Sequence, residues 1–393
     1  MSVPSALDDP HGIRLAGRDL LSLALLDSRN HLLRSLSSWP EPPAQALRIA
    51  LDAGRYQESW IARHVQRQRG EACDPDGVRL GGIEPRIALW LSPVGAPPDA
   101  QTVRSYLAQT LEITLDLLAG TPDEDPPLHF FRQALLHEDR LVEALAALLQ
   151  RGAPPARQQR APLWLPANAW LLGSPRPADG GSAWTPQSER WAHAVAVPEF
   201  EIDPQPVNWQ QFAEFAADGG YDRSALWSEG GRAWLQAGAA TGTRRAPRHV
   251  EQLRGGVLVR RGGAGVLRAA AGQAAMHLTR FEAEAWCCWA GRRLPTEPEW
   301  ELAASLASSR GFVWGDVFEW VAGSARAWPG AGASAPGCLD LMPAPDTRGT
   351  QPPHGVLRGA SFATLPRRHH AKARRFAVPA LDSAFSGFRS CAV

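Results

Sequence analysis

Hydrophobic residues recur at helical spacing through the first 150 residues and lose that spacing afterwards. Three apolar faces repeat every three or four positions, as the buried faces of amphipathic helices do. The residues on these faces are Leu25, Leu32, Leu33 and Leu36, then Val103, Leu107, Leu111 and Leu118, and finally Phe131, Leu135, Val142, Leu145 and Leu149. Because such faces bury one another economically in a bundle, residues 12–150 predict a four-helix bundle.

A polar, proline-bearing stretch separates this bundle from the rest of the chain. Residues 151–162 contain the string RGAPPARQQR without apolar periodicity, which is typical of a linker. Residues 163–393 show short apolar pieces divided by Gly, Pro and Trp, with convincing helices only at 209–218 and 280–290. The pattern predicts an α+β protein in which a loop-rich domain follows the helical bundle.

The composition narrows the class of protein. A length of 393 residues suggests about two domains, and sixteen tryptophans require an ordered core. The net charge of +1 provides no electrostatic surface for nucleic acid or an anionic membrane. Lys372 is the only lysine, and we attribute this bias toward arginine to base composition rather than to a phosphate-binding surface.

Compartment and redox state follow from the absence of certain patterns. No run of about 18 apolar residues occurs, and residues 1–10 lack the basic and apolar regions of a signal peptide, so we expect a cytoplasmic protein with no membrane partner. Five cysteines, an odd number without a CxxC pair, argue against a disulfide framework or a zinc knuckle.

Seven strings carry a family resemblance. The second region contains, in this order, EFEIDPQPVNWQQFAEFAADGGYD, HLTRFEAEAWCCWAGRRLPTEPEWELAA, GDVFEWVAG, VLRGASFAT and FSGFRSCA, and so resembles a formylglycine-generating-enzyme-like domain. The first region, with WIARHVQRQRG and LLHEDRLVEAL, resembles a DinB-like helical domain. Over nearly the whole chain, the pairing is similar to the ergothioneine-biosynthesis sulfoxide synthases and the related selenoneine synthases.

The resemblance implies an iron(II) centre between the domains that uses O2 to join sulfur or selenium to the imidazole ring of hercynine. The family supplies two ligands through the pattern HxxxHxE and a third from the second helix. In this chain His137 and Glu143 match the ends of that pattern, but Leu141, which has no lone pair, takes the middle position. The second-helix histidine aligns with Asp52 in ALDAGRYQESW.

We therefore expect a degenerate metal site with His137 and Asp52 as its remnants, and no bound iron cofactor. A site made of one histidine and one carboxylate is the alternative. A purely structural interpretation is also open, in which His137 forms a hydrogen bond at the domain interface and Asp52 pairs with Arg55 or Arg140.

The substrate-binding pattern implied by the resemblance is altered as well. Where the family resembles RNFxxPxRxDIFAGFR, this chain reads RRFAVPALDSAFSGFR, so that Arg375 replaces an asparagine and Ser383 replaces an acid. Asp382 lies one residue before the acidic position, and Arg389 belongs to the closing GFR string. Since a cation repels a quaternary ammonium group, Arg375 weakens the predicted site for hercynine.

Two further positions depart from the family on the thiol side. Leu89 stands before Trp90 where the family has an arginine, and Trp328 stands before a proline where the family has a tyrosine. A phenol commonly donates a proton in such oxidative sites, so the catalytic residues of this chain are unknown.

The scaffold strings, by contrast, are kept. GRRLPTEPEW, residues 291–300, has the turn, helix cap and arginine–carboxylate pairs that organise a loop-rich domain. A kept scaffold with lost ligands predicts a non-catalytic homologue that binds a small molecule related to hercynine or to a thiol or selenosugar, or that partners an active paralogue. The alternatives are an active iron enzyme with an unusual ligand set and a repurposed small-molecule-binding module.

Overall fold

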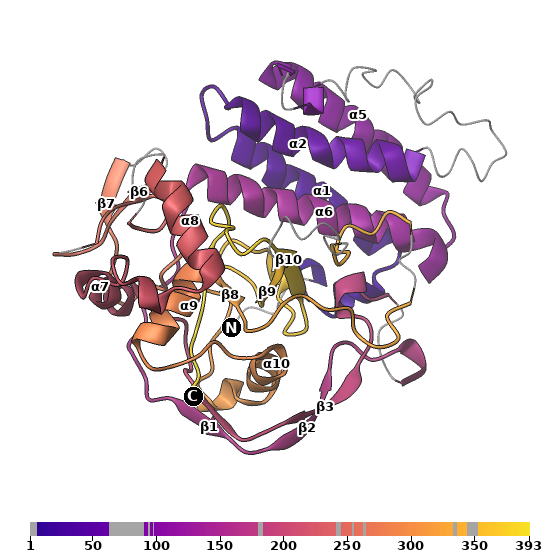
Figure 1. The fold of residues 1–393 in the computed structure, drawn as a ribbon. Coiled ribbons are helices and arrows are strands. Elements are labelled where there is room, and N and C mark those ends of the chain that lie inside the picture. The colour runs from indigo at the N-terminus through magenta and orange to yellow at the C-terminus, as the bar shows by residue number, and fades with distance from the viewer. Residues whose placement is uncertain are drawn as a thin grey trace.

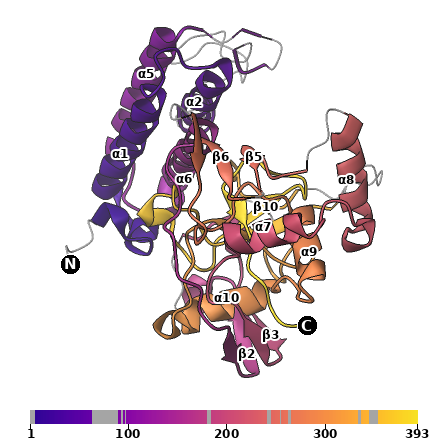
Figure 2. The ribbon, with the colours of Figure 1, turned by 90° about the vertical axis from the view of Figure 1, so that its left-hand side faces the viewer.

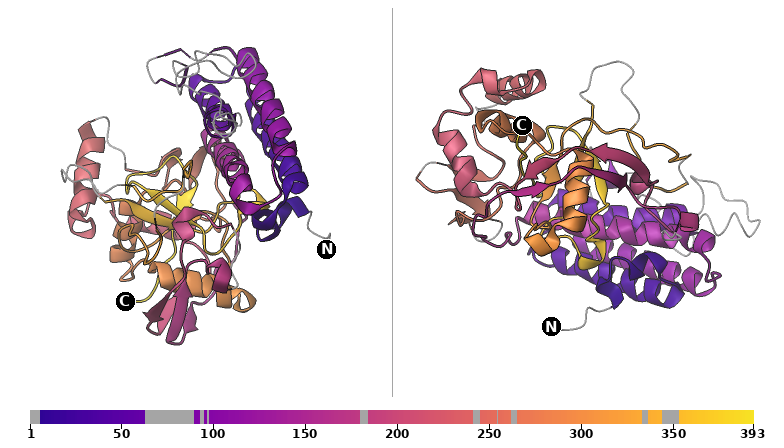
Figure 3. Two further views of the ribbon diagram at one scale, coloured as in Figure 1. Left: turned by 90° about the vertical axis from the view of Figure 1, so that its right-hand side faces the viewer. Right: turned by 90° about the horizontal axis from the view of Figure 1, so that it is seen from below.

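The computed structural model joins a layer of long helices to a region of short strands and helices, which confirms the α+β class (Figure 1). It describes residues 6–62, 90–92, 95–96, 98–179, 184–240, 245–253, 255–261, 265–332, 336–343 and 353–393. Figure 2 and Figure 3 show that the helical layer covers one side of the second region, while the C-terminus lies within that region. No helix in these ranges is long and apolar enough to cross a membrane.

Within the described residues, four long helices form the helical layer. They are α1 (Arg18–Leu36), α2 (Ala44–Tyr56), α5 (Ala100–Ala119) and α6 (Asp125–Leu149). Each of α1 and α2 packs against both α5 and α6, and α2 continues into a π-helical turn, Gln57–Ala62. The apolar faces expected from the periodicity are the buried ones: Leu32, Leu36, Val103, Leu107, Val142 and Leu145 form one cluster, and Leu25, Leu111, Leu118, Phe131 and Leu135 form another.

A buried polar network ties these helices together. Arg29 of α1 donates to Glu138 of α6 at 2.5 and 3.1 Å and also to the carbonyl of Leu107 in α5. Gln57 hydrogen-bonds to both Arg29 and Glu138 at 3.1 Å. Because each of these buried groups has its partner, the network fixes the relative positions of the four elements without leaving a buried polar group unpaired.

The second region is built from small sheets. Two antiparallel pairs join β1 (Leu163–Leu165) to β4 (Phe200–Ile202) and β2 (Asn168–Leu172) to β3 (His193–Val197). A three-stranded antiparallel sheet contains β5 (Val250–Gln252), β6 (Leu258–Arg261) and β7 (Gly265–Arg268). A four-stranded sheet has the order β10 (Arg374–Ala377), β9 (Gly355–Arg358), β8 (Phe318–Trp320) and β11 (Ser386–Gly387), in which only the β8–β11 pair is parallel.

Helices surround these sheets, and two of them were not expected from the sequence. The predicted helices correspond to α7 (Trp209–Ala217) and α9 (Arg280–Trp289), whereas α8 (Glu229–Ala240) and α10 (Glu297–Leu306) are additional. The expectation of only two helices is therefore wrong. Glycines in the α8 sequence EGGRAWLQAGAA obscure its pattern, and for α10 the string GRRLPTEPEW indicates a turn and a helix cap without a long apolar repeat.

The cap and the ion pair expected in GRRLPTEPEW are present. Thr296 and Glu299 form a reciprocal capping box at the start of α10, and Arg293 donates to the Glu299 carboxylate at 2.7 and 2.8 Å. The same capping arrangement starts α9 with Thr279 and Glu282. These local bonds satisfy backbone N–H groups that a helix leaves unpaired at its first turn.

The predicted linker lies against the second region. Ala156 forms a bridge with Gln273, and Arg157 pairs with the Asp316 carboxylate at 2.5 Å. Residues 151–162 are thus anchored by hydrogen bonds along their middle, although their sequence alone is typical of a flexible spacer.

A buried ion pair lies at the centre of the second region. Arg389 contacts Glu319 through two bonds of 2.5 and 2.7 Å, and both side chains are fully buried. Trp300 also donates to Glu319, at 2.9 Å, and the guanidinium carbon of Arg389 lies 3.8 Å from the ring centre of Phe312. This pair joins the C-terminal GFR string to β8.

We expect Arg389→Met to lower the free energy of unfolding by about 3–5 kcal/mol, because it leaves the Glu319 carboxylate buried without its partner. Arg260→Met is the matched control, since Arg260 pairs with Glu251 at an exposed position, and it should cost less than about 1 kcal/mol. Urea denaturation measures both. Equal costs for the two variants would contradict the role given to the buried pair.

Candidate functional site

The two predicted metal-site remnants meet between α2 and α6. Nε2 of His137 lies 2.9 Å from Oδ2 of Asp52, but its N–H is not aimed at that oxygen, so the contact is electrostatic rather than a well-formed hydrogen bond. Arg55, one turn further along α2, donates to Asp52 at 2.7 Å. Burial alone would raise the pKa of Asp52, but the neighbouring His137 and Arg55 outweigh it and hold that pKa below its ordinary value.

The surroundings of His137 are mostly hydrocarbon and aromatic. Leu141 packs against the helical core one turn along α6. The ring of Tyr56 lies 5.2 Å from that of His137, and its hydroxyl donates to the carbonyl of Gly337 at 2.8 Å. Burial raises the pKa of Tyr56 above its ordinary value, so the phenol stays protonated. His137 is therefore close to the contact between the helical layer and the second region.

These residues do not fit a three-ligand iron site. Across the described ranges, no three side chains from His, Cys, Asp and Glu are arranged to hold a metal ion. His137 and Asp52 offer two donor atoms, and Leu141 offers none. Asp52 pairs with Arg55, one of the two partners that we expected for it, rather than with Arg140.

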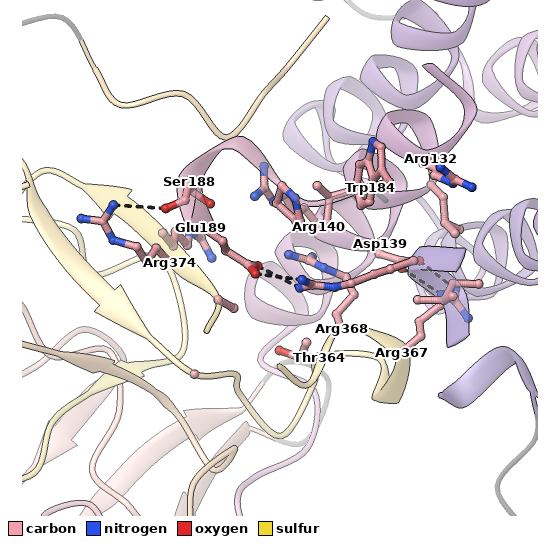
Figure 4. Close-up of a pocket in the computed structure, with 18 of the residues that line it drawn as sticks. Arg132, Asp139, Arg140, Trp184, Ser188, Glu189, Thr364, Arg367, Arg368 and Arg374 are labelled. Atoms are coloured by element: carbon pink, nitrogen blue, oxygen red, sulfur yellow. Dashed lines mark hydrogen bonds and ion pairs between the residues drawn. The ribbon is translucent and has the colours of Figure 1, made fainter. Parts of the chain in front are cut away.

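A cavity of about 80 Å³ lies between α6 and the second region (Figure 4). Leu136, Asp139 and Arg140 line it from α6, on the face next to His137. The 3-10 helices Gly12–Leu15 and Pro366–Arg368 also contribute to its wall. The cavity is unusually rich in one residue type, because its lining includes seven arginines: Arg14, Arg132, Arg140, Arg367, Arg368, Arg374 and Arg375.

Four of these arginines have carboxylate partners at ion-pair distance. The pairs are Arg14 with Glu189 at 2.8 Å, Arg132 with Asp125 at 2.5 Å, Arg367 with Asp139 and Asp27 at 2.7 Å, and Arg374 with Glu297 at 2.6 Å. Figure 4 draws the ion-pair contacts of Glu189 and of Arg367 as dashed lines, and the dashed line of Arg374 runs to the carbonyl of Ser188. The paired arginines therefore form part of the structural frame of the cavity.

Glu189 is the most strongly perturbed of these carboxylates. It is buried, and burial alone would raise its pKa, but Arg14, His370 and the hydrogen bonds from Arg14 and Ser174 together outweigh burial and lower the pKa of Glu189 to about 2. His370 lies 3.7 Å from Glu189, and its burial lowers its own pKa to about 4. At neutral pH the pair thus consists of an ionised carboxylate and an uncharged imidazole.

A second cavity of about 120 Å³ adjoins the first at Arg375, which lines both. Ser383 and Glu143 also line it. The structure thus brings together Arg375 and Ser383, two of the predicted substrate-cleft residues. Glu143 is buried and accepts a hydrogen bond from Ser361 at 2.7 Å. Asp382 lies next to this cavity with its side chain 3.1 Å from a guanidinium nitrogen of Arg248.

The other predicted site residues lie elsewhere. Trp328 is buried, with the guanidinium carbon of Arg374 3.9 Å from the centre of its ring, and Trp90 is buried in the helical core. Arg389 belongs to the core ion pair with Glu319. None of these three lines either cavity. Leu89 lies outside the described residues.

Sequence reasoning missed Arg368 and Glu189, and it named Arg140 only as a possible partner of Asp52. Arg140 stands three residues after His137, but nothing in its pattern separates it from an ordinary exposed arginine. The string RRHH at 367–370 could have indicated a cluster of cavity residues. On sequence alone, we attribute the arginine content to base composition and so give this string no weight.

Comparison with known proteins identifies the family. The profile of the sulfatase-modifying factor enzyme 1-like domain matches residues 158–316. The hercynine oxygenase of Mycobacterium tuberculosis is 30% identical over 411 residues, covering 86% of this chain and 88% of that protein. The chain belongs to the hercynine oxygenase family. The hercynine oxygenase of Mycolicibacterium smegmatis is 29% identical with the same coverage of both chains, and the formylglycine-generating enzyme of Mycobacterium tuberculosis is 32% identical over 168 residues, covering 39% of this chain and 54% of that enzyme.

Membership in the hercynine oxygenase family confirms the resemblance found in the sequence strings. The match to the sulfatase-modifying factor profile lies entirely in the region after the helical layer, as those strings indicated. Both hercynine oxygenases match over most of their length, so their similarity includes the helical layer as well.

Glu189→Gln removes the charge that balances Arg14, and we expect it to lower the free energy of unfolding by about 3 kcal/mol at pH 7. Since folding depresses the pKa of Glu189 from 4.5 to about 2, its contribution is complete above pH 4.5 and is lost as the pH falls toward 2. The difference between the variant and the wild type should therefore shrink at pH 3 in urea denaturation.

Glu251→Gln, in the exposed pair with Arg260, provides the control and should cost less than about 1 kcal/mol at either pH. A difference for Glu189→Gln that is the same at pH 7 and pH 3 would show that its carboxylate is not held in the ionised form by Arg14.

Proposed function

We propose that this member of the hercynine oxygenase family has lost the iron centre and the O2-dependent formation of C–S or C–Se bonds, and binds a small molecule in the cavities beside α6. The family reaction belongs to ergothioneine-type biosynthesis, and the helical layer corresponds to a DinB-like domain in this proposal. The observation that carries it is the environment of His137, which faces the carboxylate of Asp52 and has Leu141 one turn away.

The argument about the metal rests on donor atoms. Iron(II) held by imidazoles needs several lone pairs converging on one point. His137 supplies one, Asp52 is already engaged with Arg55, and a leucine side chain supplies none at the remaining position. A metal bound by only two such groups would dissociate readily.

The argument about the acceptor rests on charge. Arg375 lines both cavities, and its guanidinium repels the trimethylammonium group of hercynine. Asp382 does not compensate, since its carboxylate pairs with Arg248. Trp328 is buried against Arg374 and has no phenol to donate a proton.

A binding role is compatible with the kept scaffold, because stability and chemistry are carried by different residues. The core pair of Arg389 and Glu319 and the cap of α10 maintain the domain without a metal. A protein that keeps the family scaffold can also act as the partner of an active paralogue. We propose that it does so in the cytoplasm.

The alternative is an active iron enzyme with an unusual ligand set. One observation favours it: Nε2 of His137 has no well-formed hydrogen bond although it is buried, and a carboxylate oxygen of Asp52 lies 2.9 Å away. In that case the two side chains would act as ligands, and a water or a substrate atom would have to complete the site. The next two experiments separate the two candidates.

We expect the wild type to bind iron(II) weakly in anaerobic titration, with a Kd well above the micromolar range. The double change Asp52→His with Leu141→His should tighten binding by at least about tenfold, because it restores two imidazoles near His137. Asp52→Asn with Leu141→Met is the matched control and should not tighten it. Stoichiometric binding by the wild type with a sub-micromolar Kd would reject the loss of the iron centre.

We expect no product from hercynine, O2 and a thiol or selenosugar donor above the control without enzyme, even after iron loading of the Asp52→His, Leu141→His variant. Metal, donor and acceptor must be aligned together, and a misplacement of about 1 Å costs about 100-fold in rate. Mass spectrometry of the products measures this, with the Mycolicibacterium smegmatis hercynine oxygenase as the active reference. Product from the wild type would favour the iron enzyme instead.

A further inference from the structure

We infer that the cavity beside α6 binds a small, multiply charged anion through Arg140, Arg368 and Arg375. The inference rests on the proposed binding role and names the ligand class that this role requires. The three arginines come from distant parts of the chain, namely α6, the end of the helix Pro366–Arg368, and β10, and they line one cavity.

The first support is the contrast with the other arginines of the cavity. Within the described parts of the chain, the guanidinium groups of Arg140, Arg368 and Arg375 have no carboxylate within ion-pair distance and no hydrogen-bond acceptor. Nη1 of Arg368 is buried without any partner. Arg375 has only the ring of Phe318, 5.3 Å from its guanidinium carbon. Buried N–H groups are normally paired, so Nη1 of Arg368 points to an absent acceptor, and the guanidinium groups of Arg140 and Arg375 line the same cavity.

The second support is mutual repulsion. Burial, followed by the nearby charge of Arg140, lowers the pKa of Arg368 to about 10. Burial also lowers the pKa of Arg140 and of Arg375. Another arginine of the three adds to the effect in each case, although Asp340 for Arg140 and Glu143 for Arg375 oppose it more strongly. Like charges in a site with restricted solvent are costly unless an opposite charge lies between them.

Most carboxylate oxygens around the site are engaged with other groups, whereas Oδ1 of Asp340 is buried without a hydrogen-bond partner. Glu143 accepts from Ser361, Asp340 accepts from Ser188, Glu189 pairs with Arg14, and Asp139 pairs with Arg367. They reduce the positive potential at longer range, but none reaches the three guanidinium groups. Figure 4 shows Arg140 and Arg368 at the cavity without dashed lines, next to the paired Glu189 and Arg367.

The chemistry of the site indicates the kind of anion. A guanidinium group presents paired N–H donors that match two oxygens of a carboxylate or a phosphate. The cavity of about 80 Å³ exceeds the roughly 10–15 Å³ needed by one water, and Leu135, Trp184 and Phe318 give it an apolar side. A small metabolite with a phosphoryl group or several carboxylates fits, whereas a quaternary ammonium ion does not.

The test is calorimetric titration of the full chain with sodium pyrophosphate and, separately, with citrate, which distinguishes phosphoryl from carboxylate ligands. Choline is the cationic control. We expect at least one anion to bind with a Kd below 1 mM at low salt, more weakly as NaCl is raised, and choline not to bind. Arg140→Gln and Arg368→Gln should each weaken anion binding at least about tenfold, the effect of one charge-assisted hydrogen bond. Arg260→Gln, at an exposed position, should leave it unchanged.

A second measurement separates binding from a structural role. Without ligand, Arg368→Gln should have a thermal midpoint equal to or above that of the wild type, because it relieves repulsion, and citrate or pyrophosphate should raise the wild-type midpoint more than that of the variant. A lower midpoint without ligand, or equal shifts in both proteins, would overturn the inference.

Absence of binding by both anions would also overturn the inference, while the iron and turnover results would stand unaffected. Conversely, product formation by the wild type would reject the proposed loss of catalysis without deciding what the arginines bind.

Discussion

Asp139 and Arg367 form the ion pair on which the position of the cavity depends. Asp139 lies on α6 and Arg367 in the short helix Pro366–Arg368, and their atoms approach to 2.7 Å with both side chains about 1% exposed. Asp139 also accepts from Ser28, and Arg367 also pairs with Asp27, so two helices of the bundle and the C-terminal segment meet here. Since a buried charge without its partner costs several kcal/mol, this contact restricts the two regions to one arrangement.

The same pair determines where the unpaired cations lie. Arg140 follows Asp139, and Arg368 follows Arg367, so anchoring one residue of each segment brings the next into the cavity. The repulsion between these neighbours is offset by the satisfied contacts beside them, notably those of Arg14 with Glu189 and of Arg367 with Asp139. A site that is costly without its ligand can be maintained only where the surrounding frame is this well paired.

The pair of Asp52 and His137 shows a different use of the scaffold. Asp52 and His137 are held at the distance of an interacting pair by α2 and α6, although the position one turn beyond His137 is apolar. Helix packing fixes the backbone positions regardless of which side chains occupy them. The ligands of the family can therefore change while the helices that presented them stay in place.

The sequence by itself determined the family, the α+β class, the apolar faces of the bundle and the cap at Thr296, because strings and local periodicity encode them directly. Through the family resemblance it also located His137, Asp52 and Leu141. It missed α8, whose glycines hide the helical pattern, and for α10 it identified the cap but not the helix that follows. Only the tertiary structure decided which arginines are paired, since Arg367 and Arg368 are adjacent and chemically identical, yet one meets Asp139 and the other meets no carboxylate. Pairing depends on contacts between segments more than 200 residues apart in the chain, and the pattern of one segment carries no information about the other.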